Sequence, residues 1–204
     1  MWLLSLLFIL IFGSTCIRLT QLLTEGTVYH VKPVKPLISY PGNSSCPPGQ
    51  LCHTMNYLAN HSSEFFSSDH VNITLIFMCG VHYYTKDLTV QNLHSFVMKG
   101  AAESRENVII HHHFGMEDGK TWCTVIQFFN VNFVNITTLT MRCPAIKLKK
   151  SHITVKSSNL YGYPSINETL SFIRITGRGS QALLNNCTFK ENCFVRSYSS
   201  DGIL

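Results

Sequence analysis

Short segments in which apolar and polar residues alternate make up most of the chain. In AIKLK (145–149) the apolar Ile146 and Leu148 fall on one face of an extended strand. Lys147 and Lys149 fall on the opposite face. Turn-forming Asn, Gly and Ser residues separate such segments at short intervals. The pattern predicts strands at 72–78, 95–100, 107–113, 124–129, 135–141, 145–149, 152–158, 171–176 and 182–189.

One segment, LCHTMNYLANHSSEFF (51–66), predicts a short amphipathic helix instead. Its apolar residues at helical spacing are Leu51, Met55, Leu58 and Ala59. The preceding stretch VKPVKPLISYPGNSSCPPGQ (31–50) is rich in proline and predicts an extended arm. No helix-length segment interrupts the later strands, which excludes an α/β fold.

The later strands contain an imperfect repeat. FVNITTLTMRC (133–143) and ALLNNCTFKENC (182–193) both place a strand with Asn and Thr just before a cysteine, and SHITVKSSNLYG (151–162) is a looser version. The repeat is roughly twenty residues or slightly more, at the short end of solenoid repeats. Asn and Ser at the strand ends would stack where a solenoid turns its corners. We therefore predict an all-β fold, a β-solenoid with a short N-terminal cap helix. A β-sandwich is the alternative.

The N-terminal residues MWLLSLLFILIFGSTCIR (1–18) have the pattern of a secretory signal peptide. An apolar run from Trp2 to Phe12 is followed by small residues. The run is too short to cross a bilayer core about 30 Å thick as a helix. Cleavage near residue 16 predicts a secreted product with no stable transmembrane segment. An uncleaved N-terminal anchor is the alternative.

The cysteines agree with an exported protein. CPPGQLC (46–52) and CTFKENC (187–193) share a six-residue step, so each pair is a candidate local disulfide. No C-x2-C pair of the kind that binds zinc occurs. Cys16 lies in the cleavage zone, which leaves an odd number. The disulfide candidates are Cys46, Cys52, Cys79, Cys123, Cys143, Cys187 and Cys193.

The composition also points to a glycoprotein. Only 13% of the residues are charged, and the polar character comes from Ser, Thr and Asn. Six N-x-S/T sequons are present, more than chance supplies. The predicted N-glycosylation sites are Asn43, Asn60, Asn72, Asn135, Asn167 and Asn186.

A family resemblance follows from the order of the motifs. The run CPPGQLCHTMNYLANHSSEFFSSDHVNITLIFMCGVHYYTKDLTVQNLHSFVMKG (46–100) resembles the N-terminal module of secreted right-handed parallel β-helix proteins of animals, in the pectin-lyase-like superfamily. FFNVNFVNITTLTMRC (128–143) resembles their following rungs, and NNCTFKEN (185–192) resembles their recurrent repeat. The resemblance covers about residues 46–193 and implies a right-handed β-helix. The sequence departs from it at Cys79, where a proline is commoner.

The motif order divides the chain into four parts. We expect a signal peptide at 1–16, a proline-containing arm at 17–45, and a cysteine-bounded cap with a short helix at 46–69. The β-helix rungs then occupy 70–204. Proteins that the chain resembles are often longer, so two interpretations stay open, a truncation after SYSSDGIL and a natural C-terminus.

The three consecutive histidines of VIIHHHFGMED (108–118) are the strongest candidate for a metal site. In a strand, His111 and His113 share a face, and Glu117 adds a carboxylate nearby. The spacing is similar to the cupin pattern H-x-H-x3-E, but the flanking glycines of that pattern are missing. The alternative is a polar strand end that leads into a turn. We therefore predict no bound metal.

Carboxylates are too sparse for carbohydrate-active catalysis. Glycoside hydrolysis needs two acids that flank the bond, and polysaccharide lyases need a calcium-binding carboxylate cluster. Between Gly119 and Ser200 the acidic residues are Glu168 and Glu191. The resemblance therefore implies the fold and not the activity. We predict a protein that is not an enzyme, without catalytic residues or cofactors; a polysaccharide lyase or glycoside hydrolase of the pectin-lyase-like fold is the alternative.

The net charge of +5 is mild, with Arg142, Lys147, Lys149 and Lys150 close together in the sequence. Such a patch binds acidic glycans or is a solvated face that opposes edge pairing. Export excludes nucleic acid as a partner. We expect a secreted or cell-surface, non-catalytic glycoprotein module that binds extracellular glycans or proteins through one face of the β-helix.

Overall fold

The structure of the protein, a computed structural model, describes residues 26–36, 46–66, 71–101, 104–112, 114–117, 120–142, 146–161, 173–176, 179–190 and 195–197. Most of these residues lie in β-strands, and most strand pairs are parallel. The prediction of an all-β fold is therefore confirmed. Parallel pairing argues against the β-sandwich alternative, because the sheets of such sandwiches are antiparallel.

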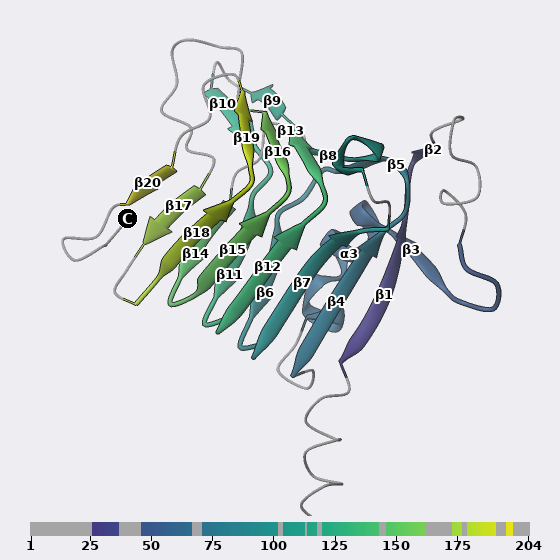
Figure 1. Ribbon diagram of the computed structural model, residues 1–204, viewed down its shortest axis with the longest axis horizontal. Coiled ribbons are helices and arrows are strands. Elements are labelled where there is room, and N and C mark those ends of the chain that lie inside the picture. The colour runs from purple at the N-terminus through teal and green to yellow at the C-terminus, as the bar shows by residue number, and fades with distance from the viewer. Residues whose placement is uncertain are drawn as a thin grey trace, which may run out of the picture.

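The described strands form three larger sheets, and Figure 1 shows those of the first sheet side by side from β1 to β18. Sheet A has the order β18(Gln181–Asn185), β15(His152–Lys156), β12(Phe133–Thr137), β7(Ser95–Gly100), β4(Asn72–Phe77), β1(Thr27–Lys32), β3(Cys52–Thr54). Sheet B has the order β19(Thr188–Lys190), β16(Asn159–Tyr161), β13(Thr140–Arg142), β8(Val108–His112), β5(Gly80–Tyr84), β2(Lys35–Pro36). Sheet C has the order β20(Val195–Ser197), β17(Ile173–Thr176), β14(Ile146–Lys149), β11(Ile126–Phe129), β6(Leu88–Gln91).

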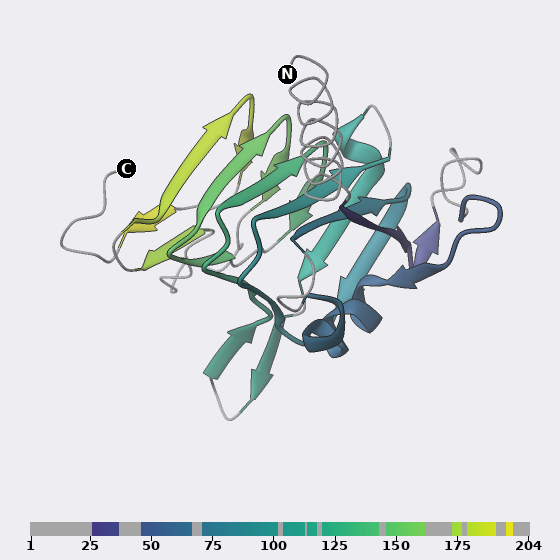
Figure 2. The ribbon, with the colours of Figure 1, turned by 90° about the horizontal axis from the view of Figure 1, so that it is seen from below.

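From β4 onwards the chain visits sheets A, B and C in turn before it returns to sheet A. Each strand of sheet A then pairs with the strand one circuit later, in the order β4, β7, β12, β15, β18. The circuits are unequal in length, since the paired residues of successive strands are Ile73, Phe96, Val134 and Ile153. The longest circuit contains the short helix η1(Arg105–Asn107) and the hairpin β9(Phe114–Glu117)–β10(Lys120–Cys123), which projects from the sheets (Figure 2).

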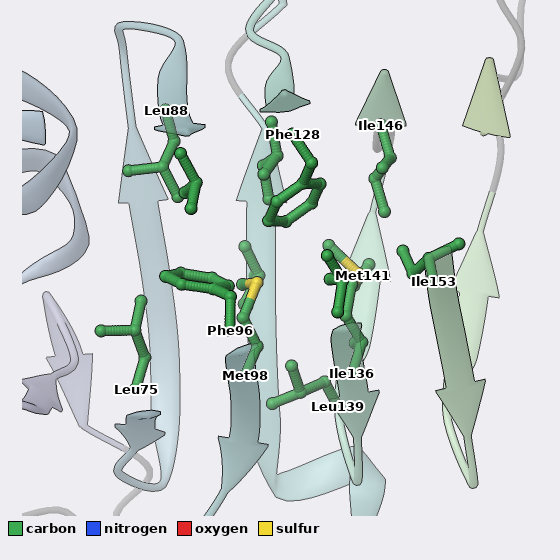
Figure 3. Close-up of a cluster of buried hydrophobic side chains, with 14 of the residues drawn as sticks. Leu75, Leu88, Phe96, Met98, Phe128, Ile136, Leu139, Met141, Ile146 and Ile153 are labelled. Atoms are coloured by element: carbon green, nitrogen blue, oxygen red, sulfur yellow. The ribbon is translucent and has the colours of Figure 1, made fainter. Parts of the chain in front are cut away.

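Inward-facing side chains of the three sheets form one hydrophobic core (Figure 3). Rows of apolar residues lie in register on adjacent strands and are at most 2% exposed. The row from sheet A is Ile73, Phe96, Val134 and Ile153. The row from sheet C is Leu88, Ile126, Ile146 and Ile173. Burial of each such side chain stabilises the fold by about 1.5–3 kcal/mol relative to exposure, so the alternating pattern determines which face of each strand points inward.

The corners between the sheets use left-handed backbone at residues other than glycine. The corners from sheet C to sheet A contain Asn92, Asn130 and Lys150, with φ of 58°, 54° and 52°. Those from sheet A to sheet B contain Thr138, Ser157 and Asn186, with φ of 59°, 46° and 51°. The Asn130 amide donates to Asn92 Oδ1 (3.1 Å) and the Asn186 amide donates to Ser157 Oγ (3.4 Å). The expected stacking of polar residues at the corners is thus present.

These corners correct two of the predicted strands. The segments 135–141 and 182–189 were each predicted as one strand, which is wrong. Thr138 divides the first into β12 and β13, and Asn186 divides the second into β18 and β19. A non-glycine residue at positive φ carries little sequence signal, and in the sequence the alternation continues through the turn.

The predicted helix is present as α3(Met55–Asn60) and α4(Ser62–Phe65). Met55, Leu58 and Ala59 are buried as expected, whereas Leu51 lies before the helix and is 77% exposed. Thr54 caps α3 by accepting the Tyr57 N–H at 3.2 Å. Leu51 has the apolar spacing of the helix, but the extended backbone of the N-cap residue Thr54 makes the helix begin at Met55.

Side-chain hydrogen bonds and strand pairing connect the N-terminal elements to the sheets. Asn56 Oδ1 of α3 accepts hydrogen bonds from the Thr85 N–H (3.0 Å) and the Thr85 hydroxyl (2.9 Å), just after β5. Strand β1 lies within the segment expected to be an extended arm, and it pairs in parallel with both β4 and β3. Residues 27–32 are therefore an integral part of sheet A.

Candidate functional site

His111 lies on the outer face of sheet B and is half-buried. Its ring stacks on the ring of Tyr83, with centroids 5.3 Å apart and planes at 25°. Arg142 is its register partner on β13, and the Arg142 guanidinium lies 5.6 Å from the ring centre of Tyr161. The outer face of sheet B thus carries a ladder of planar groups, Tyr83–His111–Arg142–Tyr161, on four adjacent strands.

The surroundings of His111 do not suit a metal ion. Burial and the positive charge of Arg142 both lower the pKa of His111, and the same positive charge would repel a metal cation. His113 lies outside the described residues, and Glu117 is described as part of the β9 backbone without its side chain. Within the described part of the chain, no group of three His, Cys, Asp or Glu side chains is placed to hold a metal.

A groove of about 820 Å³ follows the starts of three strands at the outer face of sheet A. It is lined by His94, Asn132, Phe133, His152, Ile153, Thr154, Gln181, Ala182 and Leu183. Strands β12, β15 and β18 place these residues side by side because they pair in register. We call this the sheet A groove. It combines apolar surface from Phe133 and Leu183, which are 54% and 59% exposed, with several polar side chains.

The polar side chains of the groove are partly fixed in position. The Asn132 amide donates to His94 Nδ1 at 3.3 Å. The His94 ring also meets the edge of Phe133, with centroids 5.4 Å apart and planes at 77°. His152 and Gln181 are opposite each other on β15 and β18 and are both exposed. Amide, imidazole and hydroxyl groups around an aromatic ring suit a ligand that is rich in hydroxyl groups.

Carboxylates of the described chain lie apart from the groove. Asp87 accepts hydrogen bonds from the Val125 N–H (2.8 Å) and from the Gln127 amide (2.9 Å), between β6 and β11. Glu106 accepts from the Ser104 hydroxyl at 2.9 Å beside η1. Glu168 and Glu191 lie outside the described residues. Among the described residues, those that line the groove therefore supply amide, imidazole, hydroxyl and apolar groups but no carboxylate.

Four predicted glycosylation sites lie in described parts of the chain. Asn60 at the end of α3 and Asn186 at a corner are exposed. Asn72 and Asn135 are partly exposed, in β4 and β12 of sheet A. Asn135 pairs in register with Thr154, a residue of the groove. Asn43 and Asn167 lie outside the described residues.

The described cysteines differ in their bonding: two form a disulfide, and two others are free thiols. Cys46 and Cys52 form a disulfide, as predicted. Cys187 has a free thiol close to the carbonyl oxygens of Val155 and Asn185, both at 3.3 Å, and its predicted partner Cys193 lies outside the described residues. Cys79 is a buried free thiol, and burial raises its pKa. Cys143 and Cys193 lie outside the described residues, and Cys123 is described as part of the β10 backbone without its side chain.

One buried polar residue was not singled out from the sequence. His82 occupies an inward position of β5, in the same row as Ile110 and Met141 of sheet B. Its Nε2–H donates to the Met78 carbonyl at 2.8 Å, while Nδ1 has no hydrogen-bond partner. Burial lowers the pKa of His82 to about 4, and the carbonyl groups of Met78 and Lys32 oppose this in part. His82 is therefore a neutral core residue at physiological pH.

Comparison with known proteins finds no matching family model, no matching curated protein and no matching solved structure. No helix in the described ranges is both long enough and apolar enough to cross a membrane. The signal-peptide prediction falls on residues 1–16, which lie outside the described residues. The function must therefore be argued from the residues and the geometry of this chain.

Proposed function

We propose that the protein is a secreted, N-glycosylated and non-catalytic recognition module that binds glycans through the sheet A groove. The single observation that carries the proposal is the composition of this groove. Phe133 and Leu183 offer exposed apolar surface, and they are surrounded by the amide, imidazole and hydroxyl groups described above. A sugar presents C–H faces to an aromatic ring and hydroxyl groups to such neighbours, so the groove and a glycan are complementary.

The scaffold that we propose is a right-handed parallel β-helix of the pectin-lyase-like kind. The support is that the chain visits three parallel sheets in turn and that successive circuits stack in register. The polar contacts between successive corners, such as Asn92 with Asn130, are also typical of stacked coils. A solenoid of this kind presents long, regular outer faces, which such proteins use for binding.

Export, a further part of the proposal, is supported by the N-terminal sequence, by the sequons and by a disulfide. The apolar N-terminal run, the sequons and the Cys46–Cys52 disulfide agree with passage through an oxidising compartment. Exposed positions at Asn60 and Asn186 would accept N-glycans without disturbing the core.

The experiment is a glycan-array screen of the secreted protein, with Gln181→Ala and Gln91→Ala as a matched pair of variants. Gln181 is an exposed amide in the groove, whereas Gln91 is an exposed amide on sheet C. We expect selective binding that Gln181→Ala weakens and Gln91→Ala leaves unchanged. Binding to no glycan would contradict the proposal. Shortening of the bound glycans during incubation would instead support the carbohydrate-active enzyme.

A further inference from the structure

Sheet C carries a row of basic residues that the sequence does not place together. Lys147 on β14 is the register partner of Arg174 on β17, and Arg174 is the register partner of Arg196 on β20. Lys147 and Arg174 alternate with buried neighbours, so both lie on the outer face. Successive positions of the row are one strand spacing apart, which is about 4.8 Å.

A second basic position lies beside this row. Lys149 is exposed two residues after Lys147, and Lys150 is exposed at the following corner. Arg142, which is close to these residues in the sequence, lies instead on sheet B. The structure therefore places Arg142 on a different sheet from Lys147 and Lys149. These two lysines lie on β14, which pairs with β17.

The other outward positions of sheet C are not acidic. On the described strands they are Thr89, Gln91, Gln127, Phe129 and Thr176. The nearest described carboxylate in the strand order is that of Asp87, which accepts hydrogen bonds at the β6–β11 side of the sheet, away from β14 and β17. A ligand with regularly spaced negative groups would complement these positive charges.

We propose that the outer face of β14 and β17 binds a linear sulfated glycan, which runs across the strands along the stacking direction. Guanidinium and ammonium groups donate charge-assisted hydrogen bonds to sulfate oxygens. A protein partner would need an apolar centre in its interface. Phe129 is the single large apolar residue among the outward positions named above, so this face favours a glycan over a protein. This surface is separate from the sheet A groove and takes a ligand of different charge; it shares only the assumption of export with the proposed function.

The test measures the binding of the full secreted chain to immobilised heparin, with desulfated heparin and uncharged dextran as comparison surfaces. The variant Lys147→Gln/Lys149→Gln/Arg174→Gln removes three positive charges from sheet C. The control Lys32→Gln/Lys99→Gln/Lys156→Gln removes three exposed positive charges from sheet A. Both variants have the same net charge, so a difference between them reports position.

We expect salt-sensitive binding to heparin that the sheet C variant weakens about tenfold or more and that the control largely retains. Equal losses in the two variants would overturn the proposal, because net charge alone would then explain binding. Equal binding to polyglutamate and to heparin would also overturn it in favour of an acidic protein. Lys147→Gln/Lys149→Gln without the Arg174 change should give a partial loss, and thermal unfolding checks that each variant is folded.

The same assay separates this proposal from the proposed function. Phe133→Ala alters the sheet A groove and leaves sheet C intact, so it should leave heparin binding unchanged. If array binding fails while heparin binding depends on sheet C, the groove proposal fails alone. If heparin binding is lost equally in the two charge variants while Gln181→Ala still weakens array binding, the sheet C proposal fails alone.

Discussion

The ring of His111 stacks on the ring of Tyr83 at a centroid distance of 5.3 Å, and Arg142 occupies the next position of the same ladder. His111, which belongs to the run of three histidines, therefore lies between an aromatic ring and a cation. The neighbours that a metal ligand needs are carboxylates, thiolates or further imidazoles. We therefore assign His111 to the packing of the outer face of sheet B.

The ladder predicts a change in the titration of His111. Burial and then the positive charge of Arg142 lower the pKa of His111, so Arg142→Gln should raise this pKa part of the way towards its ordinary value. NMR titration of the imidazole protons measures it. Arg174→Gln removes a positive charge from sheet C and should leave the pKa of His111 unchanged. An equal response to both substitutions would contradict the assignment.

His82 predicts a pH-dependent stability. Its pKa falls from 6.5 in the unfolded chain to about 4 in the folded protein, so the unfolded state binds the proton more readily. The contribution of His82 is present above pH 6.5 and is lost as the pH falls to about 4, by about 3 kcal/mol in total. Chemical denaturation at several pH values measures this loss.

His82→Leu should remove this part of the pH dependence, because Leu160 already occupies the same row of sheet B. His152→Gln is the control, since His152 is exposed. If the free energy of unfolding of His82→Leu keeps the slope of the wild-type protein between pH 6.5 and 4, the account of His82 is wrong.

Gly100 predicts a strong steric effect at the end of β7. A Cβ atom at this position would overlap the carbonyl oxygen of Thr138, which belongs to the corner of the next circuit. Backbone cannot move aside as a side chain can, so Gly100→Ala should lower the free energy of unfolding by about 2 kcal/mol or more. Ala101→Gly at the exposed neighbour should cost about 1 kcal/mol or less. Urea denaturation compares the two, and similar values would contradict the close approach.

Asn135 predicts a link between glycosylation and the groove. Its side chain shares the outer face of sheet A with Phe133 and is in register with Thr154. An N-glycan there would partly cover the sheet A groove, so Asn135→Gln should raise the affinity for the glycan ligand. Asn60→Gln removes a sequon from the cap and should leave the affinity unchanged. Mass spectrometry establishes the occupancy of both sites, and a fall in affinity of Asn135→Gln would contradict this arrangement.

Alternation predicted the fold class because the inward positions of the strands are mostly apolar, with His82 as an exception. Ile146 and Leu148 face the core and Lys147 and Lys149 face outward, as the sequence indicates. Strands of three or four residues, such as β6 and β16, were missed because so short a segment contains too few alternations to recognise.

The sheet A groove was not predictable in the same way. His94 and His152 are far apart in the sequence, and they line the same groove only because β7, β12 and β15 stack in register. The circuits that separate these strands differ in length, since one of them contains the β9–β10 hairpin. Without a fixed repeat, the sequence alone does not tell which residues will lie side by side.

Binding calorimetry on the groove tests the central claim most directly. The glycan selected by the array is titrated into the wild-type protein, Phe133→Ala and Phe189→Ala. Phe133 is a groove residue and Phe189 is an exposed phenylalanine of sheet B, so the two substitutions remove the same side chain from different surfaces. We predict that Phe133→Ala weakens binding about tenfold and that Phe189→Ala leaves it unchanged. Unchanged affinity in Phe133→Ala would contradict recognition through the sheet A groove.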